Sequence, residues 1–390
     1  MSSDFASQLR AYAEVIVRVG LNLQKGQKLL LAEPYELQGV ARESVELVEA
    51  VTQAAQRSGG EAVEVIWGDP ARIRALAEKA DWRGAEALAA ANARRMMAHL
   101  SDGGAFLFLL GSHPRLLEGI AAKQINELRG ITWEHFGPVV HRLMAGAVQW
   151  SLAPAPTPAW ADAAFGDLPL ADRMPALWEA VLTSCRCMQS DPVMAWETHL
   201  TDLTCERDRR NAQRLRTLRF VGERTDLTLS LPLDHLWSTT RLTTARGIPY
   251  TVNLPTDEVF TAPDKGSASG HVCITAPVAY GGSLIEGIYL EFRDGRVVEA
   301  SAGKGAALLR EILQTDSGAG RLGEVALVPT PWGKASQRCY RHVLLDENRS
   351  NHIALGSAYS FCHRKTLWPA WSLNRSLIHV DLPLSAELQE

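Results

Sequence analysis

Apolar runs alternate with amphipathic stretches along the first third of the chain. The runs lie in QKLLLAEP (residues 27–34), EAVEVIWGDP (61–70) and GGAFLFLLGSHP (103–114). Strands that are covered on both faces are apolar throughout, so we interpret these three runs as buried strands. Helices are predicted over residues 5–19 and 40–57. Strands that alternate with helices in this way indicate a parallel α/β sheet.

Prolines and one aspartate predict where two further helices begin. Asp69 is a predicted N-cap, with Pro70 at the first helical position, where proline has no hydrogen bond to lose. Pro114 is expected near the start of the helix that follows the third strand. No glycine-rich phosphate-binding motif follows any of the three runs, so the pattern gives no support for nucleotide binding.

The segment SLAPAPTPAW, residues 151–160, carries three prolines at alternate positions. Proline removes a backbone donor and favours extended conformations, so we predict a linker here. Helices are expected over residues 174–189 and 200–218. We interpret the linker and these helices as a bridge between the two halves of the chain.

Beyond residue 219 the hydrophobic pattern changes to a period of two, which is typical of half-buried strands. Asp294–Gly295 predicts a hairpin turn, and one helix is expected over residues 303–316. The predicted fold is therefore an α/β N-terminal domain followed by an α+β, strand-rich C-terminal domain. The expected ranges are 1–150 for the first domain, 151–218 for the linker and bridging helices, and 219–390 for the second domain.

Composition and charge narrow the class of protein. A chain of 390 residues with 46% hydrophobic and 22% charged residues is typical of a globular protein with two domains. A net charge of -4 and a pI near 6.3 give no reason to expect a nucleic-acid or membrane partner. The first 20 residues form a predicted amphipathic helix and not a signal peptide. Six scattered cysteines without a C-x-x-C pair suit a reducing compartment, so we expect a cytoplasmic protein.

Two glutamates of the second half raise the question of what would balance their charge. Glu258 lies in the irregular segment NLPTDEVFTAPD, directly before Val259 and Phe260. Taken alone, this segment favours an ordinary solvated acid. Glu324 begins the apolar run EVALV, where a buried carboxylate needs either a metal ion or a nearby arginine.

Two further segments combine carboxylates with histidines. The segment LLDENRSNHIALGSAY brings Glu347, His352 and Tyr359 into one short stretch, close to Asp346.

In the strand-like run LIHVDL, His379 and Asp381 are two residues apart and therefore project to the same side of a strand. A metal site and a core histidine hydrogen-bonded to an acid explain this pair equally well.

Taken together, these segments supply a set of nitrogen and oxygen donors in the last third of the chain. A single tetrahedral zinc ion would need only three or four of them. Six donors suit two divalent ions that share a carboxylate, an arrangement typical of hydrolases. The six candidates are Glu258, Glu324, Glu347, His352, His379 and Asp381.

The same segments resemble a known family. NLPTDEVFTAPD, LIEG, GRVVEASA, LGEVALVP, LDENRSNHIALGSAY and NRSLIHVD are similar to motifs of the M29 metallo-aminopeptidases. The resemblance covers nearly the whole chain, and the spacing of the motifs fits the family pattern.

The resemblance implies a metal-dependent aminopeptidase that removes N-terminal residues from short peptides with a free N-terminus. It implies two ions of zinc, cobalt or manganese in the C-terminal, catalytic domain, and a homodimer with an enclosed cavity. It also assigns the metal-binding residues, with Glu324 as the bridging ligand: Glu258, Glu324, Glu347, His352, Tyr359, His379 and Asp381.

Roles within this set stay open at the level of sequence. Glu258 or Glu324 would act as the general base. Tyr359 would bind an ion, donate a hydrogen bond to the developing oxyanion, or simply be a packed tyrosine.

Two other functions compete with the aminopeptidase. His352, His379 and Asp381 alone could form the iron site of a mononuclear non-haem oxygenase, although the three glutamates would then have no use. A non-catalytic peptide-binding protein with the same fold would hold metal without turnover.

Overall fold

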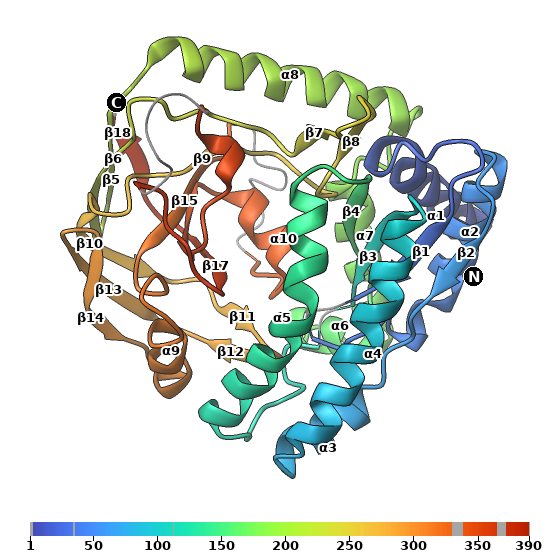
Figure 1. Cartoon of the computed structure of the whole chain (residues 1–390), viewed down its shortest axis with the longest axis horizontal. Helices are drawn as coiled ribbons and strands as arrows, with labels where there is room; N and C mark the ends of the chain where they lie inside the picture. Colours follow the sequence, from blue (N-terminus) through green and yellow to red (C-terminus); the bar gives the residue numbers. More distant parts are fainter. Residues whose placement is uncertain (1–2, 34–35, 112, 330–337, 365–371, 390) are drawn as a thin grey trace. The chain divides into compact units, whose positions relative to one another are not determined.

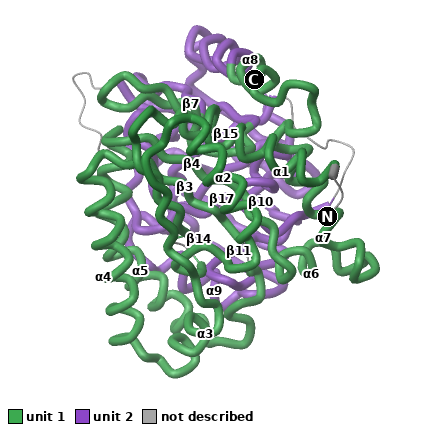
Figure 2. The backbone as a smooth tube through the Cα atoms, turned by 90° about the vertical axis from the view of Figure 1, so that its right-hand side faces the viewer, with its two compact units in different colours: residues 1–200, 240–256 green, residues 201–239, 257–390 purple. Residues whose placement is uncertain are grey.

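The computed structural model describes residues 3–33, 36–111, 113–329, 338–364 and 372–389. The chain divides into two compact units (Figure 2). Unit 1 comprises Met1–Leu200 and Thr240–Thr256, and unit 2 comprises Thr201–Thr239 and Asp257–Glu390. Each unit is described by itself.

Unit 1 contains the parallel sheet that the apolar runs predict, with a fourth strand added, in the order β2-β1-β3-β4 (Figure 1). Every residue of β1 and β3 is buried, which explains why these segments are apolar throughout instead of alternating. The strands are β1 (Leu29–Ala32), β2 (Val63–Val65), β3 (Ala105–Leu110) and β4 (Trp150–Pro154).

The linker predicted over residues 151–160 is wrong for its first part, because Trp150–Pro154 forms β4. The extended backbone that proline favours is equally suited to a strand. β4 is the last strand of the sheet order, and an edge position tolerates the missing proline donor. A short helix, α6 (Pro158–Ala164), follows, and the Thr157 side chain caps its start by accepting from Trp160 N–H.

The helices of unit 1 confirm some predicted starts and correct others. The Asp69 side chain accepts a hydrogen bond from Arg72 N–H and so caps α3 as predicted. α2 begins at Val45 and not at residue 40, because Val40 forms a bridge with Trp67. The helices are α1 (Ser3–Val15) with a π-helical turn (Ile16–Gly20), α2 (Val45–Arg57), α3 (Pro70–Glu78), α4 (Trp82–Ser101), α5 (Ala122–Met144), α6, α7 (Leu170–Ser184) and the first part of α8 (Pro192–Gln213), which continues into unit 2.

Pro114 does not start a helix, because residues 114–119 form turns and α5 begins at Ala122. Residues 214–218 are not helical either, since α8 covers Pro192–Gln213 and β5 begins at Thr217. Among the described helices, none combines the length and the apolarity that a membrane crossing requires.

Unit 2 is rich in strands, as the period of two predicts. Its larger sheet is antiparallel in the order β14-β13-β10-β6-β5-β18, and Asp294 and Gly295 make the predicted turn with positive φ angles. One helix, α9 (Ala306–Leu313), lies in the range predicted for it. The strands of this sheet are β5 (Thr217–Gly222), β6 (Thr225–Ser230), β10 (Ser269–Ile274), β13 (Ile288–Arg293), β14 (Arg296–Ser301) and β18 (Glu387–Gln389).

A second antiparallel sheet of unit 2 has the order β17-β16-β15-β9, and its strands β9, β15 and β17 are labelled in Figure 1. Its strands carry Glu324, His352, His379 and Asp381. A bulge interrupts the pairing of β15 with β16 between Leu322 and Glu324. Gly323 lies in this bulge because a Cβ there would come within 2.3 Å of Gly356 O and 2.4 Å of Ser357 O. The strands are β9 (Val259–Thr261), β15 (Leu322–Leu327), β16 (His352–Gly356) and β17 (His379–Pro383).

Gly323→Ala is expected to destabilise the protein by about 3 kcal/mol or more, because backbone atoms would have to move to admit the methyl group. Thermal unfolding measures the loss. The matched control is Gly130→Ala in α5, where a Cβ meets nothing within 4 Å. That change should raise stability by about 1 kcal/mol through helix propensity. Equal unfolding midpoints for Gly323→Ala and wild type would contradict the close approach at the bulge.

Candidate metal centre

Strand pairing places candidate residues from β15 and β17 on one face of their sheet. Glu324 of β15 lies opposite Ala354 of β16, and Ala354 lies opposite Asp381 of β17. Residues that are directly opposite in antiparallel strands project to the same face. The bulge at Gly323 contributes to this arrangement, because it shifts the alternation of side chains along β15. Leu322 and Glu324 therefore project to opposite faces of the sheet.

His352 and His379 project to the same face of the sheet, because side chains two residues apart in a strand point to one side. His352 is two residues before Ala354, and His379 is two residues before Asp381. The residue opposite His379 is Gly356, so small side chains separate the polar ones on this face.

Glu258 reaches this face from the fourth strand of the sheet. It directly precedes β9 and lies two residues before Phe260, which pairs with Ala326 of β15. Ala326 in turn lies opposite His352. Four separate segments of sequence therefore converge on one side of the sheet.

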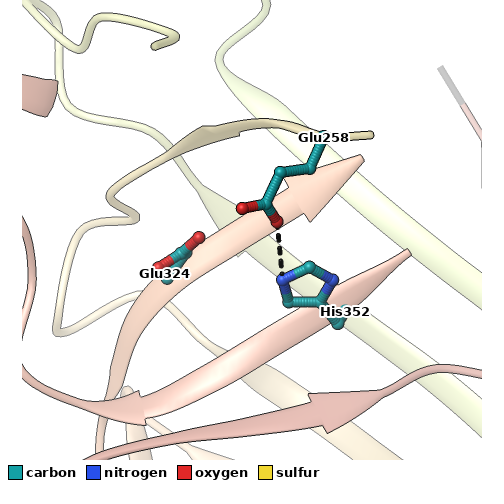
Figure 3. Close-up of side chains that lie close together, drawn as sticks. All are labelled: Glu258, Glu324 and His352. Atoms are coloured by element: carbon teal, nitrogen blue, oxygen red, sulfur yellow. Dashed lines mark ion pairs between the residues drawn. The ribbon is translucent and has the colours of Figure 1, made fainter. Parts of the chain in front are cut away.

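The converging side chains form two groups that share Glu324. Glu258, Glu324 and His352 make the first group; Glu324, His379 and Asp381 make the second, and in each group one ligand atom per residue lies within 4.8 Å of the others. His352 Nε2 is 3.0 Å from Glu258 Oε2, as Figure 3 shows, with Glu324 alongside. His379 Nε2 is 3.2 Å from Glu324 Oε2 and 3.3 Å from Asp381 Oδ1.

Backbone carbonyls orient both imidazoles. His379 Nδ1 is 2.9 Å from Ser357 O, and His352 Nδ1 is 3.3 Å from Ser350 O. A proton on Nδ1 of each ring is donated to its carbonyl, which leaves Nε2 to face the carboxylates. This is the arrangement of a histidine that is held ready to bind a metal ion.

Burial and mutual attraction shift the pKa values at the site. Burial raises the pKa of Glu324. Burial, the largest single effect, would lower the pKa of His352, but the hydrogen bond to Glu258 and the neighbouring carboxylate charges together outweigh it and raise the pKa to about 10. Burial would likewise lower the pKa of His379, which Asp381 and Glu324 raise well above its ordinary value. Burial works to raise the pKa of Asp381, and His379 more than compensates and lowers it.

Glu347 lies beside the groups but belongs to neither of them. It begins the short 3-10 turn Glu347–Arg349 and is buried. Burial raises its pKa well above the ordinary value, and the charges of Glu258 and Asp381 raise it further. The structure thus brings Glu347 within electrostatic reach of the predicted ligands.

Tyr359 lies next to His379, with 5.2 Å between the ring centroids. Its ring stacks on Phe361 at 5.3 Å and meets Phe260 edge-on at 5.7 Å. Sequence reasoning did not single out these phenylalanines, although Phe260 lies two residues beyond Glu258 and so shares its side of the strand. Whether Tyr359 and the other candidates bind metal stays a prediction.

Asp346 has a structural role, unlike its neighbour Glu347. Its carboxylate accepts hydrogen bonds from Tyr340 N–H at 2.7 Å and His342 N–H at 3.0 Å, and from the Cys339 thiol. These contacts shape the segment before the short helix α10 (Val343–Asp346).

The donor set fits divalent cations. The two groups contain three carboxylates and two histidines, and Glu347 adds a fourth buried carboxylate close by. When all four carboxylates are ionised, as metal binding requires, their negative charge exceeds the positive charge of two protonated histidines. A buried excess of this kind is costly unless a cation balances it, and imidazole with carboxylate is a donor set that zinc, cobalt and manganese accept.

Comparison with known proteins agrees with this donor chemistry. The profile of the family described as thermophilic metalloprotease (M29) matches residues 5–389. The chain belongs to the M29 family of metalloproteases. This confirms both the resemblance seen in the motifs and the assignment of the chain as a hydrolase.

Members of the M29 family resemble the chain over almost all of its length. Aminopeptidase T of Thermus thermophilus is 36% identical over 98% of this chain and 93% of its own. Aminopeptidase AmpS of Bacillus subtilis is 32% identical over the same shares. The solved structure of wild-type AmpT from Thermus thermophilus has a TM-score of 0.85 and 35% identity, covering 97% of this chain and 93% of that one.

Metal uptake is expected to release protons. In metal-free protein the raised pKa values keep His352 and His379 protonated at pH 7, and each must lose a proton to bind metal. Zinc binding at pH 7 should therefore release about two protons per chain. The affinity should fall by roughly tenfold per pH unit for each proton displaced as the pH is lowered.

Calorimetry in buffers of different ionisation enthalpy measures this release. His352→Gln should release about one proton fewer. His271→Gln, which changes a histidine of the larger sheet, serves as the matched control and should leave the count unchanged. Metal binding without proton release would show that the ion pairs described above do not exist in the metal-free protein.

Proposed function

We propose that the chain is an aminopeptidase that uses two divalent ions to remove N-terminal residues from short peptides. The observation that carries the proposal is the sharing of Glu324 between two groups of potential ligands. A single ion needs only one group, and a carboxylate common to both is the expected bridge between two ions. The names of the M29 relatives support aminopeptidase activity.

The first ion would be held by Glu258, Glu324 and His352, and the second by Glu324, His379 and Asp381. Glu347 is available as a further ligand at this cluster. Divalent ions bound there lower the pKa of water and polarise the scissile carbonyl.

The residues of the chain divide the remaining tasks. Glu324 belongs to both groups, so its carboxylate would be committed as the shared ligand. Glu258 belongs to one group, which makes it the better candidate for the general base that takes the proton of the attacking water and returns it to the leaving amine. Tyr359, next to His379, is placed to donate a hydrogen bond to the oxyanion.

The proposal accounts for the glutamates that the competing oxygenase leaves unexplained. A mononuclear iron oxygenase would use His352, His379 and Asp381, and would leave the buried Glu258 without a task. A non-catalytic peptide-binding protein would keep the same ligands and differ only in its lack of turnover. The homodimeric assembly, the enclosed cavity and the cytoplasmic location implied by the resemblance stay predictions.

Removal and return of metal tests the activity. The chelated protein should not hydrolyse leucyl or tryptophanyl anilides, and zinc, cobalt or manganese should restore turnover with two ions per chain by elemental analysis. The N-acetylated anilides should resist cleavage, because the substrate lacks a free amine. Turnover by metal-free protein would refute the proposal. Metal uptake without turnover would favour the peptide-binding protein, and iron-dependent oxygen uptake would favour the oxygenase.

Glu258→Gln tests the general base. The amide keeps the shape of the side chain but cannot take a proton, so we expect kcat to fall by about 10²–10⁴-fold at saturating metal. Steady-state kinetics with metal analysis separates this loss from a loss of metal. The control is Glu299→Gln, on the exposed part of β14, with unchanged kcat expected. A Glu258→Gln enzyme with wild-type kcat would exclude Glu258 as the base.

A further inference from the structure

Asn348 is a completely buried polar residue that contacts two parts of the metal centre. It lies at 0% exposure in the turn Glu347–Arg349. Its Oδ1 accepts a hydrogen bond from Asp257 N–H at 2.6 Å. Its Nδ2 donates to Leu344 O at 2.8 Å and to Glu347 Oε1 at 3.3 Å.

The first contact fixes the backbone that carries Glu258. Asp257 directly precedes Glu258, and the hydrogen bond from its N–H crosses 91 positions of sequence to Asn348. Glu258 lies before the first residue of β9, where strand pairing does not yet hold it. The Asn348 amide supplies the missing restraint at this point.

The second contact orients the carboxylate of Glu347. The hydrogen bond from Asn348 engages Oε1 of Glu347 and leaves Oε2 as the oxygen that can face the metal centre. Among the neighbouring charges, those of Glu258 and Asp381 act most strongly on Glu347. A hydrogen bond to a ligand carboxylate is the usual way in which proteins aim it at a metal ion.

We infer that Asn348 is a positioning residue that holds Glu258 and Glu347 at a fixed separation for metal binding. The inference rests on the proposed function. An amide suits this place, because its oxygen accepts from a backbone N–H while its NH₂ donates both to a carbonyl and to a carboxylate. Alanine would leave Asp257 N–H and the Glu347 oxygen without these partners in a buried site.

Asn348→Ala tests the inference through metal affinity. We expect the dissociation constant for zinc, measured by competition with a chromophoric chelator, to rise by about 10–100-fold. The matched control is Asn211→Ala in the same unit, because the Asn211 amide also accepts from and donates to backbone, here of Trp237. The control should lower the unfolding temperature and leave zinc affinity unchanged.

A double-mutant cycle separates positioning from simple stabilisation. If Asn348 acts through Glu347, then Asn348→Ala should cost less zinc affinity in a Glu347→Gln background, by about threefold or more. Purely structural effects would be additive. If the losses of zinc affinity from the two substitutions are additive, the contact between Asn348 and Glu347 does not contribute to zinc binding.

Asn348→Asp provides a variant of unchanged shape if the alanine variant fails to fold. Aspartate keeps the acceptor for Asp257 N–H but places a like charge beside Glu347, so zinc affinity should still fall by about threefold or more. Wild-type affinity in the folded Asn348 variants would overturn the inference and leave the proposed function intact. A wild-type chain that binds no zinc, cobalt or manganese would overturn both.

Discussion

Unit 2 has to hold several buried carboxylates close together against their mutual repulsion. Glu258 and Glu324 are each 4% exposed and Glu347 is 6% exposed, so water screens little of their charge. The two histidines offset part of this repulsion through their ion pairs. The rest of the architecture keeps these groups together: four paired strands, small residues between the polar ones, and backbone carbonyls behind the imidazoles.

The sequence was most informative where one local rule decides the outcome. His379 and Asp381 are two residues apart, and the period of a strand alone brings them to one side, as β17 shows. Asp69 and Pro70 predicted the start of α3 for an equally local reason. The fully apolar runs likewise predicted β1 and β3, because burial on both faces leaves no other pattern.

Where two structures share one local preference, the sequence could not choose between them. The prolines of residues 151–160 favour an extended backbone, which serves a linker and an edge strand alike, so β4 was missed. The environment of Glu258 was misjudged from its own segment, since its neighbours Glu324 and His352 come from β15 and β16. The bulge at Gly323 depends on how closely Gly356 approaches, which no local pattern reveals.

The order of strands in the second sheet has a consequence for unfinished or trimmed chains. β17 closes one side of the sheet and comes more than fifty residues after β15, which holds the shared Glu324. A fragment that ends before β17 lacks His379 and Asp381 and exposes an edge of β16 instead. The second group of ligands proposed here would therefore be complete only after β17 has joined the sheet.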